Sequence, residues 1–198
     1  GLLGFWDAGI RVRHNDIAVD GGNGTWQATG NFAWTSSTGA INTPWVNDRF
    51  AIFQATPGTV TVDLAQGAVS FAGAQFAVDG YSVAGQPLIT NTAHTIVRVG
   101  DGTAPGAAFT ATVGTVIQGS GGIDKTDLGT LVPTADNTWS GGTTITAGTL
   151  TLHQQHADGS EESTTLRAND YAINPPGTWH TADVPEGVPP AQRLRLPM

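Results

Sequence analysis

Short runs of β-branched, aromatic and other apolar residues follow one another along most of this chain, and each run is bounded by Gly, Pro, Asn or Asp. Such runs are typical of β-strands, and their boundaries are typical of turns. The apolar spacing of an amphipathic helix is almost absent. The chain is therefore predicted to be all-β, with strands at residues 51–55, 58–63, 68–72, 81–84, 95–100, 108–114 and 143–153.

Two all-β architectures compete for these strands. Spacings of about 8–12 residues fit a sandwich or a barrel. Hairpin signals are few, however, the best being Asp-Gly at 79–80 and at 101–102. Residues 58–63 and 148–152 instead alternate Thr with Val or Leu, so they can stack with Thr outside and the apolar residues inside. This favours a parallel β-helix of roughly five rungs over residues 50–152, a rod about 25 Å tall.

The first 45 residues differ from the rest because they contain most of the tryptophan, at Trp6, Trp26, Trp34 and Trp45. Large aromatic side chains at one end of a solenoid can plug the open core of the first rung. Alternatively, Trp26, Trp34 and Trp45 can form a stacking platform for a sugar ring or another partner. The plug is favoured, because four indoles are a large apolar content for so thin a core.

Composition and charge limit the functions that this fold can carry. Charged residues make up 12% of the chain and hydrophobic residues 39%, which does not fit disorder. The net charge is −8 and Lys125 is the single lysine, which argues against binding to nucleic acid. An acidic surface leaves neutral sugars or cationic partners open. Because the chain has no cysteine, it has neither disulfides nor thiolate metal sites.

A long ordered motif occupies residues 121–152. Its parts are Gly-Gly-Ile-Asp-Lys-Thr-Asp-Leu-Gly-Thr-Leu-Val at 121–132, Asn-Thr-Trp-Ser-Gly-Gly-Thr-Thr-Ile at 137–145 and Ala-Gly-Thr-Leu at 147–150. This motif resembles the passenger-associated repeat of bacterial autotransporters. The tryptophan-rich start and the rung series before it resemble the rest of such a passenger, so the resemblance covers about residues 1–152. Pro133 and Trp139 depart from the usual pattern, and a proline is expected at a strand edge or corner.

The resemblance implies a right-handed parallel β-helix in a protein that is exported through the periplasm and displayed on the bacterial surface or secreted. It also implies a translocator barrel in the full-length protein, and it assigns no catalytic residue to the repeat. The repeat positions that shape the rungs are Gly121, Gly122, Gly129, Asn137, Gly141, Gly142 and Gly148. The glycines permit corner dihedrals that other residues avoid. Asn137 can hydrogen-bond to its neighbours at a corner or join an asparagine ladder between rungs.

The sequence changes character after Leu152. Pro175, Gly177 and His180 match the second motif of cupins, whereas Asn169 and Val184 stand where cupins have Gly and Asn. By this resemblance His180 is a metal ligand.

The remaining ligands of such a site would be His153, His156 and Glu161. Residues i and i+3 of a strand point to opposite faces, so His153 and His156 can share a metal only across a bulge or turn. The tail is too short to close a cupin barrel, and two or three antiparallel strands that cap the last rung are the alternative.

The predicted organisation is an N-terminal cap at 1–45, β-helix rungs at 46–152 and a cupin-like tail or capping hairpin at 153–198. The leading function is a non-enzymatic one: a surface-displayed adhesin or scaffold without a cofactor, which contacts a host surface, glycans or copies of itself. The alternative is a cupin-like module that binds a divalent transition metal through its C-terminal histidines and acts on a small molecule. His14 and His94 could serve a catalytic triad, but the sequence contains no Gly-x-Ser-x-Gly motif.

Overall fold

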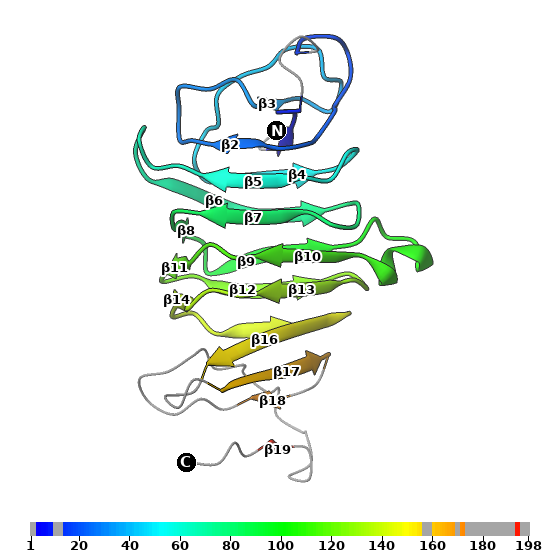
Figure 1. Cartoon of the computed structure of the whole chain (residues 1–198), viewed down its shortest axis with the longest axis vertical. Coiled ribbons are helices and arrows are strands. Elements are labelled where there is room, and N and C mark those ends of the chain that lie inside the picture. The colour runs from blue at the N-terminus through cyan, green and yellow to red at the C-terminus, as the bar shows by residue number, and fades with distance from the viewer. Residues whose placement is uncertain (1–2, 10–13, 156–159, 169–170, 173–192, 195–198) are drawn as a thin grey trace.

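The computed structural model describes residues 3–9, 14–155, 160–168, 171–172 and 193–194, which stack into a tall column of short strands (Figure 1). One sheet contains the strands β1 (Leu3–Trp6), β3 (Trp34–Thr35), β4 (Arg49–Phe53), β6 (Val69–Phe76), β8 (Leu88–Thr90), β9 (His94–Val99), β11 (Ile117–Gly119), β12 (Gly122–Thr126), β14 (Thr138–Trp139) and β15 (Thr143–Ile145). A second sheet contains β2 (Gly24–Trp26), β5 (Thr59–Val62), β7 (Ser82–Gly85), β10 (Thr110–Val113), β13 (Thr130–Pro133), β16 (Thr149–Gln155) and β17 (Glu161–Arg167). β18 (Tyr171–Ala172) pairs with β19 (Arg193–Leu194).

The long strand β6 divides the first sheet into two faces. Residues Val69–Phe71 pair with β8, whereas Gly73–Phe76 pair with β9. From that point each rung has three strands, in the orders β7-β8-β9, β10-β11-β12 and β13-β14-β15, and each pairs in parallel with the strand one rung away. The predicted parallel β-helix is therefore confirmed, with a triangular section below β6.

The strand register shows how much chain one rung consumes. Thr110 lies beside Thr130, and Thr130 beside Thr149, so these rungs are 20 and 19 residues long. Ser82 lies beside Thr112, a separation of 30 residues. The longer rung contains the 3₁₀ helix η2 (Ala104–Ala108), which projects from the column between β9 and β10 (Figure 1). Additional residues are thus placed in a corner loop, where they leave the ladder intact.

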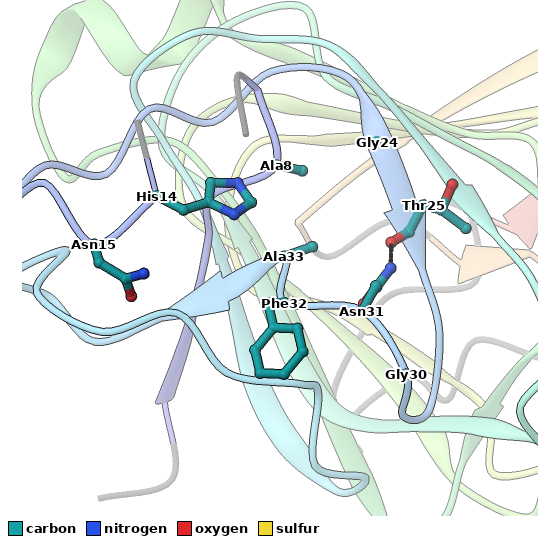
Figure 2. A pocket seen from close by; sticks show the side chains of 9 residues that line it. All are labelled: Ala8, His14, Asn15, Gly24, Thr25, Gly30, Asn31, Phe32 and Ala33. Atoms are coloured by element: carbon teal, nitrogen blue, oxygen red, sulfur yellow. Dashed lines mark hydrogen bonds between the residues drawn. The ribbon is translucent and has the colours of Figure 1, made fainter. Parts of the chain in front are cut away.

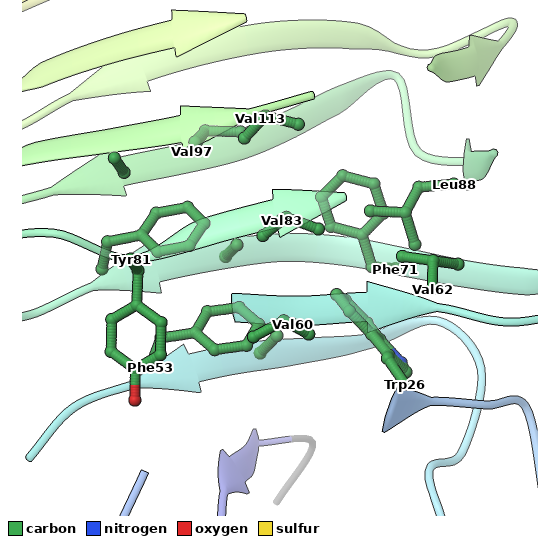
Figure 3. Packing of buried hydrophobic residues seen from close by; sticks show 14 of the residues in the cluster. Trp26, Phe53, Val60, Val62, Phe71, Tyr81, Val83, Leu88, Val97 and Val113 are labelled. Carbon is green, nitrogen blue, oxygen red and sulfur yellow. The ribbon is translucent and has the colours of Figure 1, made fainter. Parts of the chain in front are cut away.

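Alternating side chains build the core. In β5 the side chains of Val60 and Val62 are buried, while Thr59 and Thr61 are exposed. Val60 stacks on Val83 and Val83 on Val113 in successive rungs (Figure 3). Burying one valine is worth roughly 1.5–3 kcal/mol, so each rung stabilises its neighbours.

Pro133 continues the stack of inward residues formed by Val60, Val83 and Val113. It is buried at the last position of β13, in register with Val113. A proline at a strand end removes no donor from the middle of the ladder. The expected corner position is therefore what the structure has.

Four indoles fill the N-terminal end of the core. The ring centroids of Trp26 lie 5.0 Å from those of both Trp34 and Trp45, and Trp34 and Trp45 are 4.4 Å apart. Trp6 contacts Trp34 edge to face at 5.0 Å. Trp26, Trp34 and Trp45 are only 1%, 1% and 2% exposed. The stacking-platform interpretation of these three residues is therefore wrong: other aromatic rings cover the faces that a sugar would need, and the indoles plug the core.

The parallel ladder ends in an antiparallel hairpin. β17 pairs with β16 from Thr149 opposite Arg167 to Gln155 opposite Glu161. Leu166 is buried against the end of the core. The C-terminal hairpin of the predicted fold is thus confirmed. The boundaries of the three predicted regions stay a prediction. No helix of the described ranges has the length and hydropathy needed to cross a membrane.

Candidate functional site

The repeat contains a buried lysine that joins two corners. The Nζ of Lys125 donates hydrogen bonds to the carbonyl oxygens of Thr126 and Asp127, at 2.8 Å each, and to that of Ala147 at 3.2 Å. The first two carbonyls belong to the corner after β12, and the third to the corner one rung further. Burial lowers the pKa of Lys125 to about 8, against the opposing effect of the Asp127 carboxylate. This lysine therefore fastens the repeat internally and does not face solvent.

Asp127 organises the same corner from outside. Its carboxylate accepts hydrogen bonds from Arg98 Nε at 2.8 Å and from the backbone N–H groups of Gly102 and Leu128. Burial alone would raise the pKa of Asp127, but these hydrogen bonds and the charge of Arg98 hold it below its ordinary value. Its φ of 64° marks a left-handed turn, which Asp tolerates better than most residues.

The predicted repeat residues lie where neighbouring rungs approach each other closely. A Cβ on Gly122 would lie 2.6 Å from the carbonyl oxygen of Gly141. Similar contacts surround Gly121, Gly129 and Gly148, and Gly142 and Gly148 have positive φ. Asn137 is buried, and its Oδ1 accepts a hydrogen bond from the N–H of Ile117 in the preceding rung at 2.7 Å. These positions hold rungs together and offer no reactive group to solvent.

The histidines assigned to a metal site are only partly within the described residues. His153 is exposed on β16 opposite Ser163, and Glu161 pairs with Gln155. His156 and His180 lie outside the described residues. Within the described ranges no three His, Cys, Asp or Glu side chains gather to hold a metal ion. The metal site stays a prediction.

The two histidines considered for catalysis lie apart from one another. His94 is exposed on β9, and its Nδ1 lies 3.1 Å from a carboxylate oxygen of Asp124 on β12. This is an ion-pair geometry on an open face of the sheet. His14 lies instead at the N-terminal cap, where it lines a cavity.

That cavity is the best candidate for a binding site in the described part of the chain. It has a volume of about 530 Å³, within the range of ligand pockets. Figure 2 shows the side chains of His14, Asn15, Asn31 and Phe32 around it, between β2 and the loops of the cap. A second cavity of about 20 Å³ lies among apolar core side chains and is too small for a ligand.

The polar groups of the cap cavity are held in fixed positions. Asn31 donates a hydrogen bond from Nδ2 to the carbonyl of Thr25, which orients its Oδ1. Asn42 exchanges hydrogen bonds with the Asn15 loop, at 2.9 and 2.7 Å, and donates to the carbonyl of Phe32 at 3.2 Å. One buried amide thus fixes two walls of the cavity. Sequence reasoning missed these residues, because the tryptophans beside them carried the stronger aromatic signal.

The fold and these sites define a class of protein: a parallel β-helix whose rungs are joined by hydrogen bonds at strands and corners and whose candidate binding cavity lies at its cap. Residues 123–152 match the family model described as the passenger-associated-transport-repeat. The chain is also 48% identical over 165 residues to the Adhesin BmaC autotransporter of Brucella suis biovar 1 (strain 1330). That alignment covers 80% of this chain and 5% of the relative's length.

These two matches confirm the resemblance of the chain to an autotransporter passenger fragment. Neither match supports the cupin-like interpretation of the tail. A search of solved structures gives no significant match.

Proposed function

We propose that this chain is a stretch of a surface-displayed autotransporter passenger that acts as an adhesive β-helical scaffold and needs no cofactor. The identity to a protein named as an adhesin supports this proposal, as does the match to a passenger repeat. In the full-length protein a translocator would carry the chain from the periplasm to the cell surface. The chain spans 5% of the relative's length. The proposed adhesive role therefore concerns this segment and not the rest of the passenger.

The observation that carries the proposal is a flat face lined with hydroxyl groups. The outward residues of the second sheet are mostly threonines, which we call the threonine flank: Thr25, Thr59, Thr61, Thr110, Thr112, Thr130, Thr149 and Thr151. Thr25 lies beside Thr61, Thr110 beside Thr130, and Thr130 beside Thr149, whereas Ala84 and Val132 interrupt the flank. Thr130 and Thr149 share a hydrogen bond of 2.7 Å between their Oγ1 atoms.

The chemistry of this flank suits contact with a surface. Its hydroxyl groups both donate and accept hydrogen bonds and carry no charge. Threonines of neighbouring rungs are about 4.8 Å apart, so several weak contacts can form at once. Multivalent contact of this kind raises avidity without requiring a deep pocket. A host surface, a glycan layer or a second copy of the chain could each meet such a flank.

The proposal is tested with the purified chain coupled to beads. Retention is measured on surfaces coated with matrix proteins, with glycans or with the same chain, and albumin-coated beads serve as the blank. Thr61→Arg places a charge on the threonine flank, and Thr144→Arg places the same charge on the exposed side of β15. We expect the first variant to lower retention and the second to leave it unchanged. Wild-type retention equal to the albumin blank on every surface would overturn the proposal.

A further inference from the structure

The cavity at the N-terminal cap has two buried polar atoms without a hydrogen-bond partner in the described structure. These are Nε2 of His14 and Oδ1 of Asn31. A buried polar atom without a partner costs about 1–3 kcal/mol, and such atoms are uncommon in folded proteins. The residues that carry these atoms, His14 and Asn31, both line the same cavity. A ligand hydroxyl that reaches the two atoms from the cavity would supply the missing partners.

An exposed aromatic ring stands beside these atoms. Phe32 is 59% exposed although its neighbours Ala33 and Trp34 are buried. Phe32 is one of the residues that line the cavity, and Figure 2 shows its ring beside Asn31. An exposed phenyl face with amide and imidazole groups at its side is amphipathic. It offers an apolar surface and directed hydrogen bonds to the same ligand.

The scaffold around the cavity is preorganised. Asn42 connects the loops around the cavity by hydrogen bonds. Its Nδ2 donates to Asp7 Oδ2 at 2.9 Å, and its Oδ1 accepts from the backbone N–H of Asn15. A fixed cavity loses little conformational entropy when a ligand binds.

We propose that this cavity binds a neutral pyranose sugar, with one ring face against Phe32 and its hydroxyl groups on Asn31 and His14. A hydroxyl donates and accepts at once, so it satisfies the acceptor Oδ1 of Asn31 and satisfies Nε2 of His14 in either tautomer. The C–H face of a pyranose ring suits the negative face of an aromatic ring. The described residues that line the cavity include no lysine or arginine, which disfavours an anionic sugar. The proposal rests on the adhesive function proposed above and adds a site apart from the threonine flank.

The test is saturation-transfer NMR on the whole chain. The probes are methyl glycosides of neutral hexoses and of N-acetylhexosamines, compared with sialylated and sulfated glycans. We expect the wild-type chain to bind at least one neutral glycoside. Phe32→Ala and Phe32→Leu should both weaken its binding by about tenfold, because each removes the aromatic face. His14→Ala should also weaken it.

Ile41→Ala is the matched control, because Ile41 is a second exposed apolar residue of the cap, 67% accessible, that does not line the cavity. Its affinity for the glycoside should equal that of the wild type. Near-ultraviolet circular dichroism of the buried tryptophans reports whether each variant keeps the fold.

Three results would overturn the proposal: no neutral glycoside bound by the wild type, equal affinity of the Phe32→Leu variant, or preference for the anionic glycans. The bead assay separates this failure from failure of the adhesive function. If no neutral glycoside binds and beads still adhere equally with wild type and Phe32→Leu, the cavity is rejected and the threonine flank remains the adhesive surface.

Discussion

Lys125 provides the sharpest test of the structure, because a lysine buried in a hydrophobic column changes charge within an accessible pH range. Lys125→Met keeps the length of the side chain and removes the ammonium group. Three carbonyls then lose a donor, those of Thr126, Asp127 and Ala147. At about 2 kcal/mol per unpartnered carbonyl, the free energy of unfolding falls by about 6 kcal/mol. Removing a buried charge is itself stabilising and offsets part of this loss.

The size of this offset follows from the pKa of Lys125. It is lowered from 10.5 to about 8 in the folded chain. At 1.36 kcal/mol per pH unit this shift corresponds to at most about 3 kcal/mol, reduced by any solvent screening. The expected net destabilisation of Lys125→Met is therefore about 3 kcal/mol at pH 7.

The pH dependence has a definite sign. Between pH 8 and 10.5 the unfolded chain holds a proton on Lys125 that the folded chain has released. The wild-type free energy of unfolding therefore rises with pH over this window through this group. The variant lacks that contribution, so the difference between the two proteins should grow from pH 8 to pH 10.

Urea unfolding followed by tryptophan fluorescence measures this difference, and the six tryptophans give the signal. Tyr81 also titrates at high pH, since burial raises its pKa above the ordinary value. It is present in both proteins and cancels in the comparison. A difference that stays constant or shrinks between pH 8 and pH 10 would refute the burial of Lys125.

Three further outcomes follow from the same structure. Trp26→Ala should lower the free energy of unfolding by about 3–5 kcal/mol, measured by urea titration, because it opens a cavity among the other indoles; a loss below about 1 kcal/mol would contradict the plug. Asp127→Asn should flatten the loss of stability on acidification, because the lowered pKa of Asp127 gives stability that is present above its unfolded pKa and lost as pH falls; unchanged acid unfolding curves would contradict this. Gly148→Ala should destabilise by at least about 1 kcal/mol, because φ at Gly148 is +69° and the new Cβ would meet the Asp127 carbonyl. Thermal unfolding measures this destabilisation, and a midpoint equal to that of the wild type would contradict the positive φ at Gly148.

The architecture could be predicted from sequence because its signal is repeated. Thr alternates with Val at 59–62 and with Leu at 149–152, and one rung can bury these apolar residues only by stacking on the next. The division of one sheet into two faces at β6 could not be predicted, because Val69–Phe76 forms one strand whose sequence does not show where pairing passes from β8 to β9. The point of division depends on which strands pair with β6 in the neighbouring rungs. The sequence of β6 alone does not contain this information.

Burial of Lys125 could not be predicted for a different reason. Lysine is among the residues least often buried, so nothing in the motif marks Lys125 as a buried side chain. Only the stacking of two rungs brings the carbonyls of Thr126 and Ala147 within reach of one ammonium group. The cap cavity was missed in a similar way. The sequence offered Trp26, Trp34 and Trp45 as the alternative stacking platform, whereas the exposed ring is that of Phe32. Hydrophobic area alone does not tell which aromatic residue the core retains.

The distribution of these constraints explains where function can lie in such a chain. Inward positions such as Val83 are fixed by the rung on each side, and corners such as Asn137 by hydrogen bonds to the preceding rung. A change at either position weakens the interface between two rungs. The outward positions of the strands and the loops of the cap are not constrained by packing between rungs. Recognition can therefore vary at Thr61 or Phe32 without loss of the ladder, which is why both proposed contact surfaces lie there.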